Sequence, residues 1–421
     1  MGLLIQNTKT KTDWRNIMIN VIGLGYIGLP TALMLAAHGN KVIGTDFNKT
    51  LVSTLNEGKT TFEEIGLDEL FESALSKDIT FTTDYISTDK YIITVPTPYD
   101  KDNKKIDPSY VISAVKSVLD VCKENTLLVI ESTVSPGTID KFVRPVIEES
   151  KFSLGKDIHL IHAPERILPG NMIHELKHNS RTIGADDFKQ GEKLKKIYET
   201  FCKSEITITD IKTAEMSKVI ENTFRDVNIA FANELAKICR FDDMDVYEII
   251  RVANMHPRVN ILNPGPGVGG HCISVDPWFL VGDYPELTNI ISTARYINDS
   301  MPDFVLKRIS EIMDEKNITD MSKVGIYGLT YKQDVDDTRE SPTLQLFDSM
   351  KKHLASPLKS FDPMIKEQIV ENQILDFDEF IENIELLVVM VGHSHIKDNM
   401  NKISEKIIFD TQNVVPNGIK L

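Results

Sequence analysis

The sequence has little cysteine and no long hydrophobic run. Its four cysteines are scattered over 421 residues, and no two of them have the CxxC spacing of a redox or metal motif, which fits a reducing compartment. No segment approaches the roughly 18 apolar residues that a membrane-spanning helix needs. Met1–Asn16 lacks the apolar stretch of a signal peptide, and we interpret it as an N-terminal extension. We therefore expect a soluble, cytoplasmic protein.

Positive charge is also in short supply. The chain has 47 Lys and Arg against 62 Asp and Glu, a formal net charge of −15. This balance argues against nucleic acid or an anionic membrane as the main partner. An anionic ligand must instead be met by a few local Lys and Arg side chains. The length predicts about two to three domains, and the 41% hydrophobic content is ordinary for a globular protein.

A dinucleotide-binding unit is predicted near the N-terminus. The apolar run Ile17–Ile22 leads directly into the glycine motif GLGYIG, Gly23–Gly28. A helical pattern follows at Pro30–His38, and then a second strand-like run at Lys41–Thr45. This is the GxGxxG fingerprint in its required context of strand, turn, helix and strand, where the helix N-terminus offers N–H groups to a pyrophosphate.

An acidic residue follows the glycine motif at the expected spacing. Asp46 lies 18 residues after Gly28, where such an acid accepts hydrogen bonds from the ribose hydroxyls. A carboxylate at this position repels a 2′-phosphate, which favours NAD over NADP. Lys49 is a weaker signal in the opposite direction.

Three further strand-like runs are each followed by a polar turn. They are Tyr91–Val95, Thr126–Ile130 and Ile158–Ile161. Ligands of a doubly wound parallel sheet bind at the carboxyl ends of its strands, so the turn residues are candidates for the functional edge. Ordinary turn chemistry is the alternative, because Thr, Pro, Ser and Gly are common in loops. The candidates in these turns are Thr97, Thr133, Glu165 and Arg166.

A long helix is predicted at Lys212–Arg240. Lys218, Asn222 and Arg225 fall at positions i, i+4 and i+7 and therefore share one face of it. Such a stripe is often only the solvated face, but an ammonium and an amide one turn apart also suit an oxyanion. The helix has apolar residues on more than one side, which indicates burial. Helices near the middle of the chain are candidates for a homodimer interface.

The glycine-rich stretch PGPGVGGHCISVDPW, Pro264–Trp278, carries one thiol. Its four glycines let the backbone adopt unusual conformations and approach a ligand closely. Cys272 follows the glycines, and Asp276 lies four residues later. We interpret Cys272 as a nucleophile. A structural turn with a passenger cysteine is the alternative. A helical region at Thr288–Lys316 comes next, which we expect Pro302 to break or kink.

The chain then restarts as a second α/β unit. Strands are expected at Lys323–Tyr327, Leu358–Phe361, Leu386–Val391 and Ile407–Phe409. This unit lacks the GxGxxG motif, so we expect it to bind something other than a dinucleotide. The fold class predicted is α/β, with two Rossmann-like doubly wound parallel sheets joined by a central helical segment. The expected domains are residues 17–211, 212–316 and 317–421.

Two polar clusters in this last unit have competing interpretations. Lys332 and Arg339 can meet phosphates, or they can simply pair with the neighbouring acids of the DVDDTRESP loop. His393 and His395 follow a predicted strand, but no third ligand stands at metal-binding spacing. We interpret these two histidines as loop residues and expect no metal site.

Together these motifs resemble the UDP-glucose/GDP-mannose dehydrogenase superfamily along nearly the whole chain. The resemblance rests on GLGYIGLP, VPTPY, EST, APERILPGN, TAEMSKVIENTFRDVNIAFANEL, HPRVNILNPGPGVGGHCISVDPWF and GLTYKQDVDDTRESP. RDVNIAFANE, HPRVN and GGHCISVDPWF are more typical of the UDP-N-acetyl-D-mannosamine branch. UDP-N-acetylglucosamine and UDP-glucose dehydrogenases remain alternatives within the family.

The resemblance implies a four-electron oxidation of a sugar C6 alcohol, with two NAD⁺ per turnover. Cys272 would attack the C6 aldehyde, pass through a thiohemiacetal and a thioester, and have its thiol pKa lowered by its surroundings. Lys218 and Asn222 would stabilise the oxyanion, and Asp276 and Glu165 are the candidate bases. The implied cofactor residues are Gly23, Gly25, Tyr26, Ile27, Gly28, Asp46, Thr97, Thr133 and Arg339. The implied substrate residues are Arg166, Ile167, Lys218, Asn222, Arg225, His256, Arg258, Gly267, Tyr331, Lys332 and Arg339.

The resemblance also implies a homodimer, in which Arg258 would serve the neighbouring subunit's site. One departure from the family pattern concerns the base: UDP-glucose relatives carry a second Glu four residues after the one matching Glu165, and this chain has Pro169 there. Two other classes remain open. One is a two-electron hydroxyacid dehydrogenase, which needs no Cys272, and the other is a non-catalytic regulator that binds NAD or a nucleotide sugar.

Overall fold

The structure is a computed structural model that describes residues 18–270, 272–352 and 358–421. The predicted N-terminal extension, residues 1–16, lies outside the described residues, as does Ile17. The chain divides into two compact units. The first contains the residues up to Pro98 and Asp107–Met216, and the second contains Tyr99–Ile106 and Ser217–Leu421.

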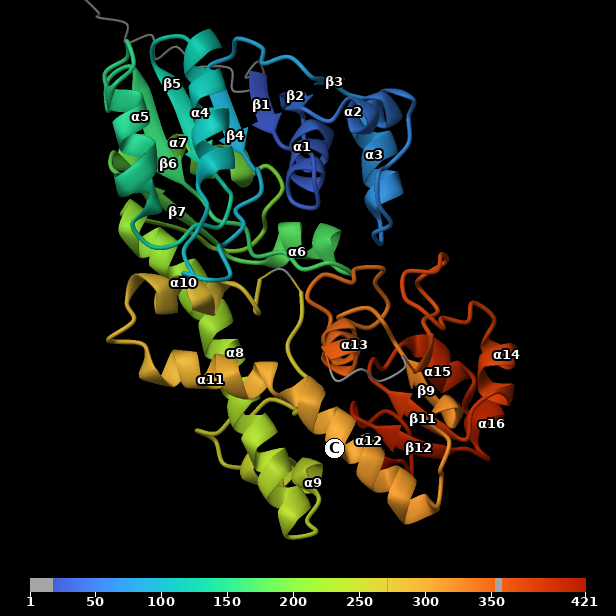
Figure 1. Cartoon of the computed structure of the whole chain (residues 1–421). Coiled ribbons are helices and arrows are strands. Elements are labelled where there is room, and N and C mark those ends of the chain that lie inside the picture. The colour runs from blue at the N-terminus through green and yellow to red at the C-terminus, as the bar shows by residue number, and fades with distance from the viewer. Residues whose placement is uncertain (1–17, 271, 353–357) are drawn as a thin grey trace, which may run out of the picture. The chain divides into compact units, whose positions relative to one another are not determined.

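An eight-stranded sheet forms the centre of the first unit (Figure 1). Its strands are β1 (Met18–Ile22), β2 (Lys41–Thr45), β3 (Ile79–Thr82), β4 (Lys90–Ile93), β5 (Thr126–Ile130), β6 (Ile158–His162), β7 (Arg181–Ala185) and β8 (Ile206–Thr209). Its helices are α1 (Gly28–Ala37), α2 (Lys49–Asn56), α3 (Leu67–Leu75), α4 (Ser109–Val121), α5 (Arg144–Glu148), α6 (Met172–His178) and α7 (Phe188–Tyr198). A short π-helical turn at Ile139–Val143 precedes α5.

The strand order β3-β2-β1-β4-β5-β6-β7-β8 makes this a doubly wound sheet. The order reverses between β1 and β4, which is the switch point where such sheets bind ligands. Every neighbouring pair is parallel except β6 and β7, which the sequence did not predict. All residues of β5 and β6 are buried, as expected for continuous apolar runs in the middle of a parallel sheet.

The second unit contains a five-stranded, all-parallel sheet in the order β10-β9-β11-β12-β13 (Figure 1). Its strands are β9 (Val324–Tyr327), β10 (Lys359–Phe361), β11 (Leu386–Val389), β12 (Ile407–Asp410) and β13 (Ile419–Lys420). Its helices are α9 (Val246–Ala253), α10 (Asp276–Asp283), α11 (Asn289–Asp299), α12 (Met301–Lys316), α13 (Pro342–Lys352), α14 (Phe377–Glu382), α15 (Ser394–Asp398) and α16 (Met400–Ile403). The two sheets, parallel apart from the β6–β7 pair, and their flanking helices confirm the predicted α/β fold class.

A 31-residue helix, α8 (Ile211–Phe241), begins in the first unit and continues in the second. It matches the predicted helix at Lys212–Arg240. The predicted break near Pro302 is also confirmed. α11 ends at Asp299, and α12 begins at Met301 with Pro302 in its first turn, where the missing N–H of proline costs no hydrogen bond.

The sequence patterns did not predict four short strands, β3, β7, β8 and β13. β3 and β8 are four-residue strands with threonine and half-exposed positions, and β13 has only two residues. β7 begins with a buried arginine, Arg181, which is atypical of a buried strand. None of the helices in the described ranges is long and apolar enough to cross a membrane.

The segment Tyr99–Ile106 packs closely on helix α10. The Lys104 ammonium lies 4.3 Å from the centre of the Trp278 ring, and a Cβ atom added to Gly282 would lie only 2.3 Å from the Lys104 carbonyl oxygen. We predict that Gly282→Ala lowers the free energy of unfolding by about 1–3 kcal/mol, because backbone must move to accept the methyl group. Thermal unfolding measures this loss. Gly265→Ala is the control, since its nearest neighbour would lie at 3.8 Å. Equal stability of the two variants would contradict the prediction.

Candidate functional site

The glycine turn of the first unit is built as the sequence predicts. Gly23 has a φ of 89°, and a Cβ there would lie 2.9 Å from the Thr94 carbonyl oxygen. At Gly28, a Cβ would lie 1.7 Å from the Gly23 carbonyl oxygen, so only glycine lets α1 start this close to the turn. The Asp46 carboxylate accepts hydrogen bonds from the backbone N–H groups of Leu24 (2.8 Å) and Asn48 (2.8 Å). Asp46 at the end of β2 is thereby held against the turn at the end of β1.

This turn fits a dinucleotide. A Cβ added at Gly25 would meet nothing within 4 Å in the described structure, so the backbone there faces open space. No described side chain caps the N-terminus of α1, so its first N–H groups and its positive dipole end are suited to a phosphate. Tyr26 and Ile27, in the same turn, are half-buried. These residues would hold the pyrophosphate of NAD, and Asp46 its ribose.

The two predicted cofactor threonines meet at the same edge of the sheet. The Thr97 hydroxyl, in the turn after β4, donates a hydrogen bond to the Thr133 carbonyl oxygen, in the turn after β5 (2.7 Å). Neighbouring parallel strands end at the same edge, which explains why these residues, 36 positions apart, lie together.

Glu165, one of the two candidate bases, is almost fully buried and has partners on both carboxylate oxygens. One oxygen accepts from the Arg166 backbone N–H at 2.7 Å, and the other pairs with the Arg181 guanidinium. Arg181 also pairs with Glu131 at 3.2 Å. Burial, opposed by Arg181 and reinforced by Glu165, raises the pKa of Glu131 to about 7.

The side chains next to Glu165 also have partners inside the first unit. The Arg166 guanidinium donates to the Ser180 carbonyl oxygen (2.8 Å) and to the Thr182 hydroxyl (2.9 Å). Ile167 is buried in the hydrophobic core of this unit. Their expected role at the sugar therefore stays a prediction.

In the second unit, the glycine-rich loop places Cys272 just before helix α10. Gly267 and Gly270 have φ values of 139° and 86°, which residues with a side chain rarely adopt. The Cys272 carbonyl oxygen accepts hydrogen bonds from the N–H groups of Val275 (3.1 Å) and Asp276 (2.8 Å). These bonds close a turn that brings the Asp276 side chain into the same region as the thiol.

Asp276 joins two residues of α8 in a buried polar cluster. Its carboxylate accepts a hydrogen bond from the Asn222 amide at 2.6 Å and lies 4.0 Å from the Lys218 ammonium. All three residues are at most 6% exposed. The side chains of Lys218 and Asn222, one helical turn apart, thus face the protein interior. The alternative of a solvated stripe is wrong for these two residues. We call Lys218, Asn222, Cys272 and Asp276 the cysteine cluster.

The pKa of the Cys272 thiol differs from what we expected from the sequence. Burial raises the pKa of Asp276 to about 6, with Lys218 and the Asn222 hydrogen bond acting in the opposite direction. Burial also raises the pKa of the Cys272 thiol, and the Asp276 charge adds to this, while Lys218 and Arg339 lower it. The expectation of a lowered thiol pKa is therefore wrong for this structure, because loss of solvent outweighs the two cations.

The remaining predicted substrate residues fall into two groups, one on the exposed surface and one beside the glycine loop. The first group, which is exposed on the second unit, consists of Arg225, His256 and Arg258. Tyr331 and Lys332 lie in the turn after β9, while Arg339 clamps Asp337 with hydrogen bonds of 2.6 to 3.1 Å. Tyr331, Lys332 and Arg339 form the second group, beside the glycine loop. The Gly270 N–H donates to the Arg339 carbonyl oxygen at 2.9 Å, and a Cβ at Gly267 would lie 3.1 Å from Pro342.

Sequence reasoning missed Arg181, the buried partner of Glu165, and Glu131, which pairs with the same guanidinium. Arg181 begins a strand that was not predicted. Glu131 stands in the EST turn, in which only Thr133, two residues later, was predicted as a site residue. Tyr198 completes this group by donating its hydroxyl hydrogen bond to Glu131 at 3.0 Å. The only signal in the sequence was an isolated acid and an isolated base at strand ends.

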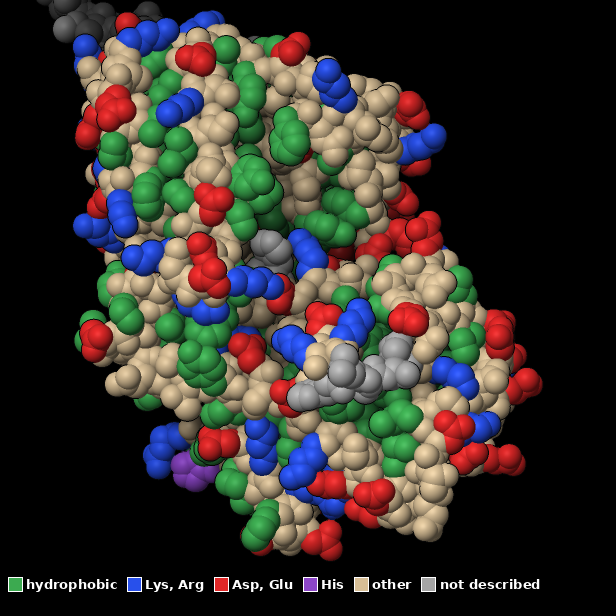
Figure 2. Space-filling view, in the orientation of Figure 1, with side chains coloured by type: hydrophobic (Ala, Val, Ile, Leu, Met, Phe, Trp, Pro, Cys, Tyr) green, Lys and Arg blue, Asp and Glu red, His purple; other side chains and the backbone are tan. Residues whose placement is uncertain are grey.

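Charged side chains of both signs are spread over the surface, as expected from a composition with 47 Lys and Arg and 62 Asp and Glu. Figure 2 shows Asp and Glu side chains interspersed with Lys and Arg over both units on the face in view. No three His, Cys, Asp or Glu side chains of the described ranges are grouped so that they could hold a metal ion.

Sequence models of one family match three consecutive parts of the chain. They are described as the NAD binding domain, the central domain and the UDP binding domain of the UDP-glucose/GDP-mannose dehydrogenase family. They match residues 17–202, 212–300 and 325–417 respectively.

Individual relatives are similar along almost the whole chain. A UDP-N-acetyl-D-mannosamine dehydrogenase of Methanococcus aeolicus is 43% identical over 412 residues, which cover 95% of this chain and 92% of the relative. An NDP-N-acetyl-D-galactosaminuronic acid dehydrogenase of Ralstonia nicotianae is 39% identical over 418 residues, with 95% and 96% covered. Among solved structures, a UDP-N-acetyl-mannosamine dehydrogenase from Staphylococcus aureus has a TM-score of 0.85 and 41% identity, covering 96% of this chain and 97% of its own.

Proposed function

The chain belongs to the UDP-glucose/GDP-mannose dehydrogenase family, and on this basis we propose that it oxidises the C6 alcohol of UDP-N-acetyl-D-mannosamine to a carboxylate. NAD⁺ would be held by the glycine turn of the first unit and would supply the oxidising power, with a separate NAD⁺ molecule accepting the hydride of each of the two oxidations. The choice of sugar follows the names of relatives that are 40–43% identical to this chain.

The observation that carries the proposal is the cysteine cluster. A thiol alone would serve many purposes, but the half-buried Cys272 thiol lies in one cluster with a buried ammonium, a buried amide and a buried carboxylate. A two-electron alcohol dehydrogenase needs no nucleophile, whereas the conversion of an aldehyde to an acid by hydride transfer does. Covalent addition of the thiol makes the aldehyde carbon C6 tetrahedral, and the hydrogen on this carbon can then leave as a second hydride.

Cys272 bonds to C6 of the aldehyde left by the first oxidation, and the aldehyde oxygen takes up a proton to give a thiohemiacetal. The second oxidation removes a hydride from C6 and the hydroxyl proton, which leaves a thioester. Water adds to the thioester carbon, and the C–S bond breaks to release the acid and the Cys272 thiolate. Lys218 and Asn222 stabilise the negative oxygen at each addition step.

Asp276 is the base that we assign to proton transfer at Cys272. With a pKa of about 6 it is mostly ionised at pH 7. When the thiol proton moves to Asp276, the charge that raises the thiol pKa disappears, so no second negative charge has to be buried. Glu165 is the weaker candidate for water activation, because Arg181 and the Arg166 N–H occupy both of its oxygens.

A substrate panel with NADH counted per sugar consumed tests the proposal. We expect two NADH per UDP-N-acetyl-D-mannosamine, and much lower kcat/KM for UDP-N-acetylglucosamine, UDP-N-acetylgalactosamine, UDP-glucose and GDP-mannose. The first two differ from the expected substrate only in the configuration of ring carbons, so they are the sharpest controls. One NADH per sugar would contradict the four-electron reaction, and an equal rate on UDP-glucose would contradict the choice of sugar.

A homodimer through helix α8 is part of the same proposal. Ile220, Phe224, Phe231 and Ile238 are 49–65% exposed in the single chain. At about 100° per residue they fall within roughly 40° of one another, so they form one apolar stripe. We expected this helix to be buried on more than one side, and a second copy of the chain would cover the exposed stripe. Exposed Arg258 is suited to serve the partner's site.

The proposed location is the cytoplasm, where the Cys272 thiol stays reduced.

We predict that Phe231→Glu yields a monomer with little activity, because a charge is placed in the middle of the apolar stripe. Light scattering gives the mass, and NADH production gives the activity. Phe188→Glu, which alters an exposed phenylalanine on α7 of the first unit, should leave both unchanged. A Phe231→Glu protein that stays dimeric would rule out this interface.

A further inference from the structure

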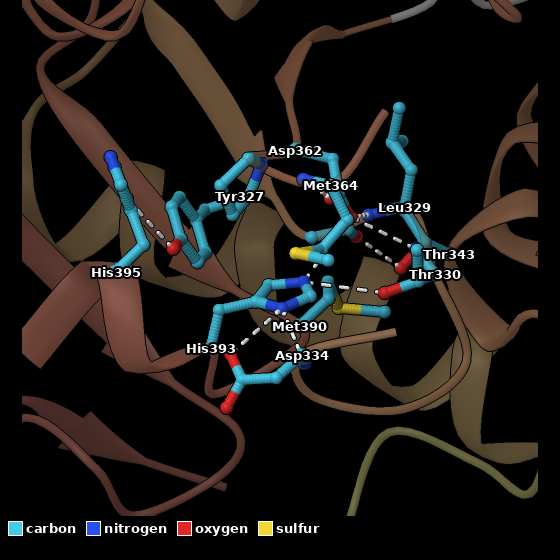
Figure 3. A network of polar contacts seen from close by, with 12 residues as sticks. Tyr327, Leu329, Thr330, Asp334, Thr343, Asp362, Met364, Met390, His393 and His395 are labelled. Atoms are coloured by element: carbon cyan, nitrogen blue, oxygen red, sulfur yellow. Dashed lines mark hydrogen bonds and ion pairs between the residues drawn. The ribbon is translucent and has the colours of Figure 1, made fainter. Parts of the chain in front are cut away.

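The second unit contains a fully buried histidine that the proposed function does not use. His393 follows β11 and is 0% exposed. Its imidazole lies between the Asp362 carboxylate, at the end of β10, and the turn that follows β9 (Figure 3). Because β9, β10 and β11 are neighbouring parallel strands, their carboxyl ends bring these groups together.

The hydrogen bonds define the tautomer of this imidazole. His393 Nδ1 accepts a hydrogen bond from the Asp334 backbone N–H at 2.9 Å, so Nδ1 carries no proton. The proton is then on Nε2, which lies 3.2 Å from the Thr330 hydroxyl oxygen and 3.3 Å from the Asp362 carboxylate. The Thr330 hydroxyl donates in turn to the Lys332 carbonyl oxygen at 3.0 Å. Every group in this network thus has a compatible donor or acceptor.

These bonds fix the segment Gly328–Asp334 at both of its ends. Asp362 accepts from the N–H groups of Leu329 (2.6 Å) and Thr330 (3.0 Å) at the start of the segment. His393 binds the N–H of Asp334 at its end. Tyr331 and Lys332, the residues expected to line the nucleotide-sugar pocket, lie between the two anchor points.

The same segment contacts the loop that carries Cys272. A Cβ atom added at Gly269 would lie 2.7 Å from Cβ of Tyr331, and one added at Gly270 would lie 2.7 Å from Cε2 of the Tyr331 ring. Tyr331 therefore packs directly against the two glycines that stand just before the cysteine. The position of the Gly328–Asp334 segment consequently sets the path of the Cys272 loop.

We propose that His393 is a positioning residue, which holds Gly328–Asp334 so that Tyr331 and Lys332 meet the nucleotide sugar while Tyr331 supports the Cys272 loop. This inference rests on the proposed function for the identity of the ligand. His393 acts through these residues and does not touch the reacting atoms. Its loss removes the acceptor of the part-buried Asp334 N–H and one of the donors to the buried Asp362 carboxylate, which favours another arrangement of the segment.

Three variants test this role, with His395→Asn as the matched control. His393→Asn keeps an acceptor close to the position of Nδ1, His393→Phe keeps only the ring, and Thr330→Val removes the hydroxyl that bridges His393 and Lys332. His395 is two residues further on, and its ring lies against Tyr327, with Nδ1 3.2 Å from the Tyr327 hydroxyl. Each protein is measured by calorimetry with UDP, by NADH binding, by steady-state kinetics and by the rate of Cys272 alkylation with iodoacetamide.

We expect His393→Phe to weaken UDP binding at least tenfold, to lower kcat and to alkylate several-fold faster, with NADH affinity unchanged. Thr330→Val should follow the same direction with a smaller effect, and His393→Asn should recover part of the loss. His395→Asn should match the wild type. Unchanged UDP affinity and alkylation in both His393→Phe and Thr330→Val would overturn the proposal. A loss of NADH affinity in parallel with UDP affinity would also overturn it, by indicating general unfolding.

The outcome is separable from that of the proposed function. If the wild-type protein fails to release two NADH from UDP-N-acetyl-D-mannosamine, the proposed function fails, whatever the His393 variants do. If the wild type performs that reaction but the variants bind UDP normally, only the positioning role fails.

Discussion

Cys272→Ser should abolish acid formation and lower NADH release from the UDP-sugar by at least ~10³-fold. A serine hydroxyl has a far higher pKa than a thiol, and Lys218 and Asp276 are placed to assist a thiol. Binding of UDP and NADH, measured by calorimetry, should stay within about twofold of wild type. The substitution exchanges atoms of similar size in a half-buried position, so the fold should be retained.

Cys239→Ala is the matched control for this prediction. Cys239 is a buried thiol on helix α8 that packs in the hydrophobic core of the second unit. Its loss should cost some stability but leave two NADH per sugar. If Cys272→Ser still released two NADH per sugar at a rate near that of the wild type, no covalent intermediate on Cys272 would be required. The four-electron mechanism would then need a different explanation.

Lys218→Met should lower kcat by about 10²–10³-fold, the usual effect of removing one oxyanion-stabilising donor. Methionine keeps the length of the side chain and removes its charge, 4.0 Å from the Asp276 carboxylate. Because Lys218 lowers the pKa of both Asp276 and Cys272, both pKa values should rise in the variant. UDP affinity should change much less than kcat.

The pH profile separates this electrostatic role from a structural one. A base with a pKa of about 6 is active when ionised, so wild-type turnover should fall as the pH drops through about 6. In Lys218→Met this fall should occur at a higher pH. Lys212→Met, which alters an exposed lysine of α8 paired with Asp140, should keep the wild-type profile. An unshifted profile with reduced kcat would mean that Lys218 does not act on Asp276.

Much of the site was predictable because its members stand at short, regular spacings. Lys218 and Asn222 lie one helical turn apart, and the turn between Cys272 and Asp276 spans four residues, so local geometry already brings each pair to one side of its element. The glycine motif with Asp46 is similar, since the βαβ unit that contains it is a local structure.

The ion pairs that Arg181 makes with Glu165 and Glu131 were not predictable in this way. Arg181 and Glu131 are 50 positions apart and meet only because β5, β6 and β7 are neighbours in the sheet. The pairing of β6 and β7 is antiparallel, which no local pattern indicated. The pKa values of Asp276 and Cys272 were equally out of reach, because they depend on how completely solvent is removed around each group.

By itself, the sequence determined the α/β fold class, the dinucleotide turn, the long helix and the family, since all of these follow from short-range patterns of glycine, apolar residues and charge. Only the tertiary structure decided that Lys218 and Asn222 face inward to Asp276, that burial raises the thiol pKa, and that His393 anchors the turn beside the Cys272 loop. Burial and strand order are properties of the folded chain, because they depend on residues that are distant in sequence and adjacent in space.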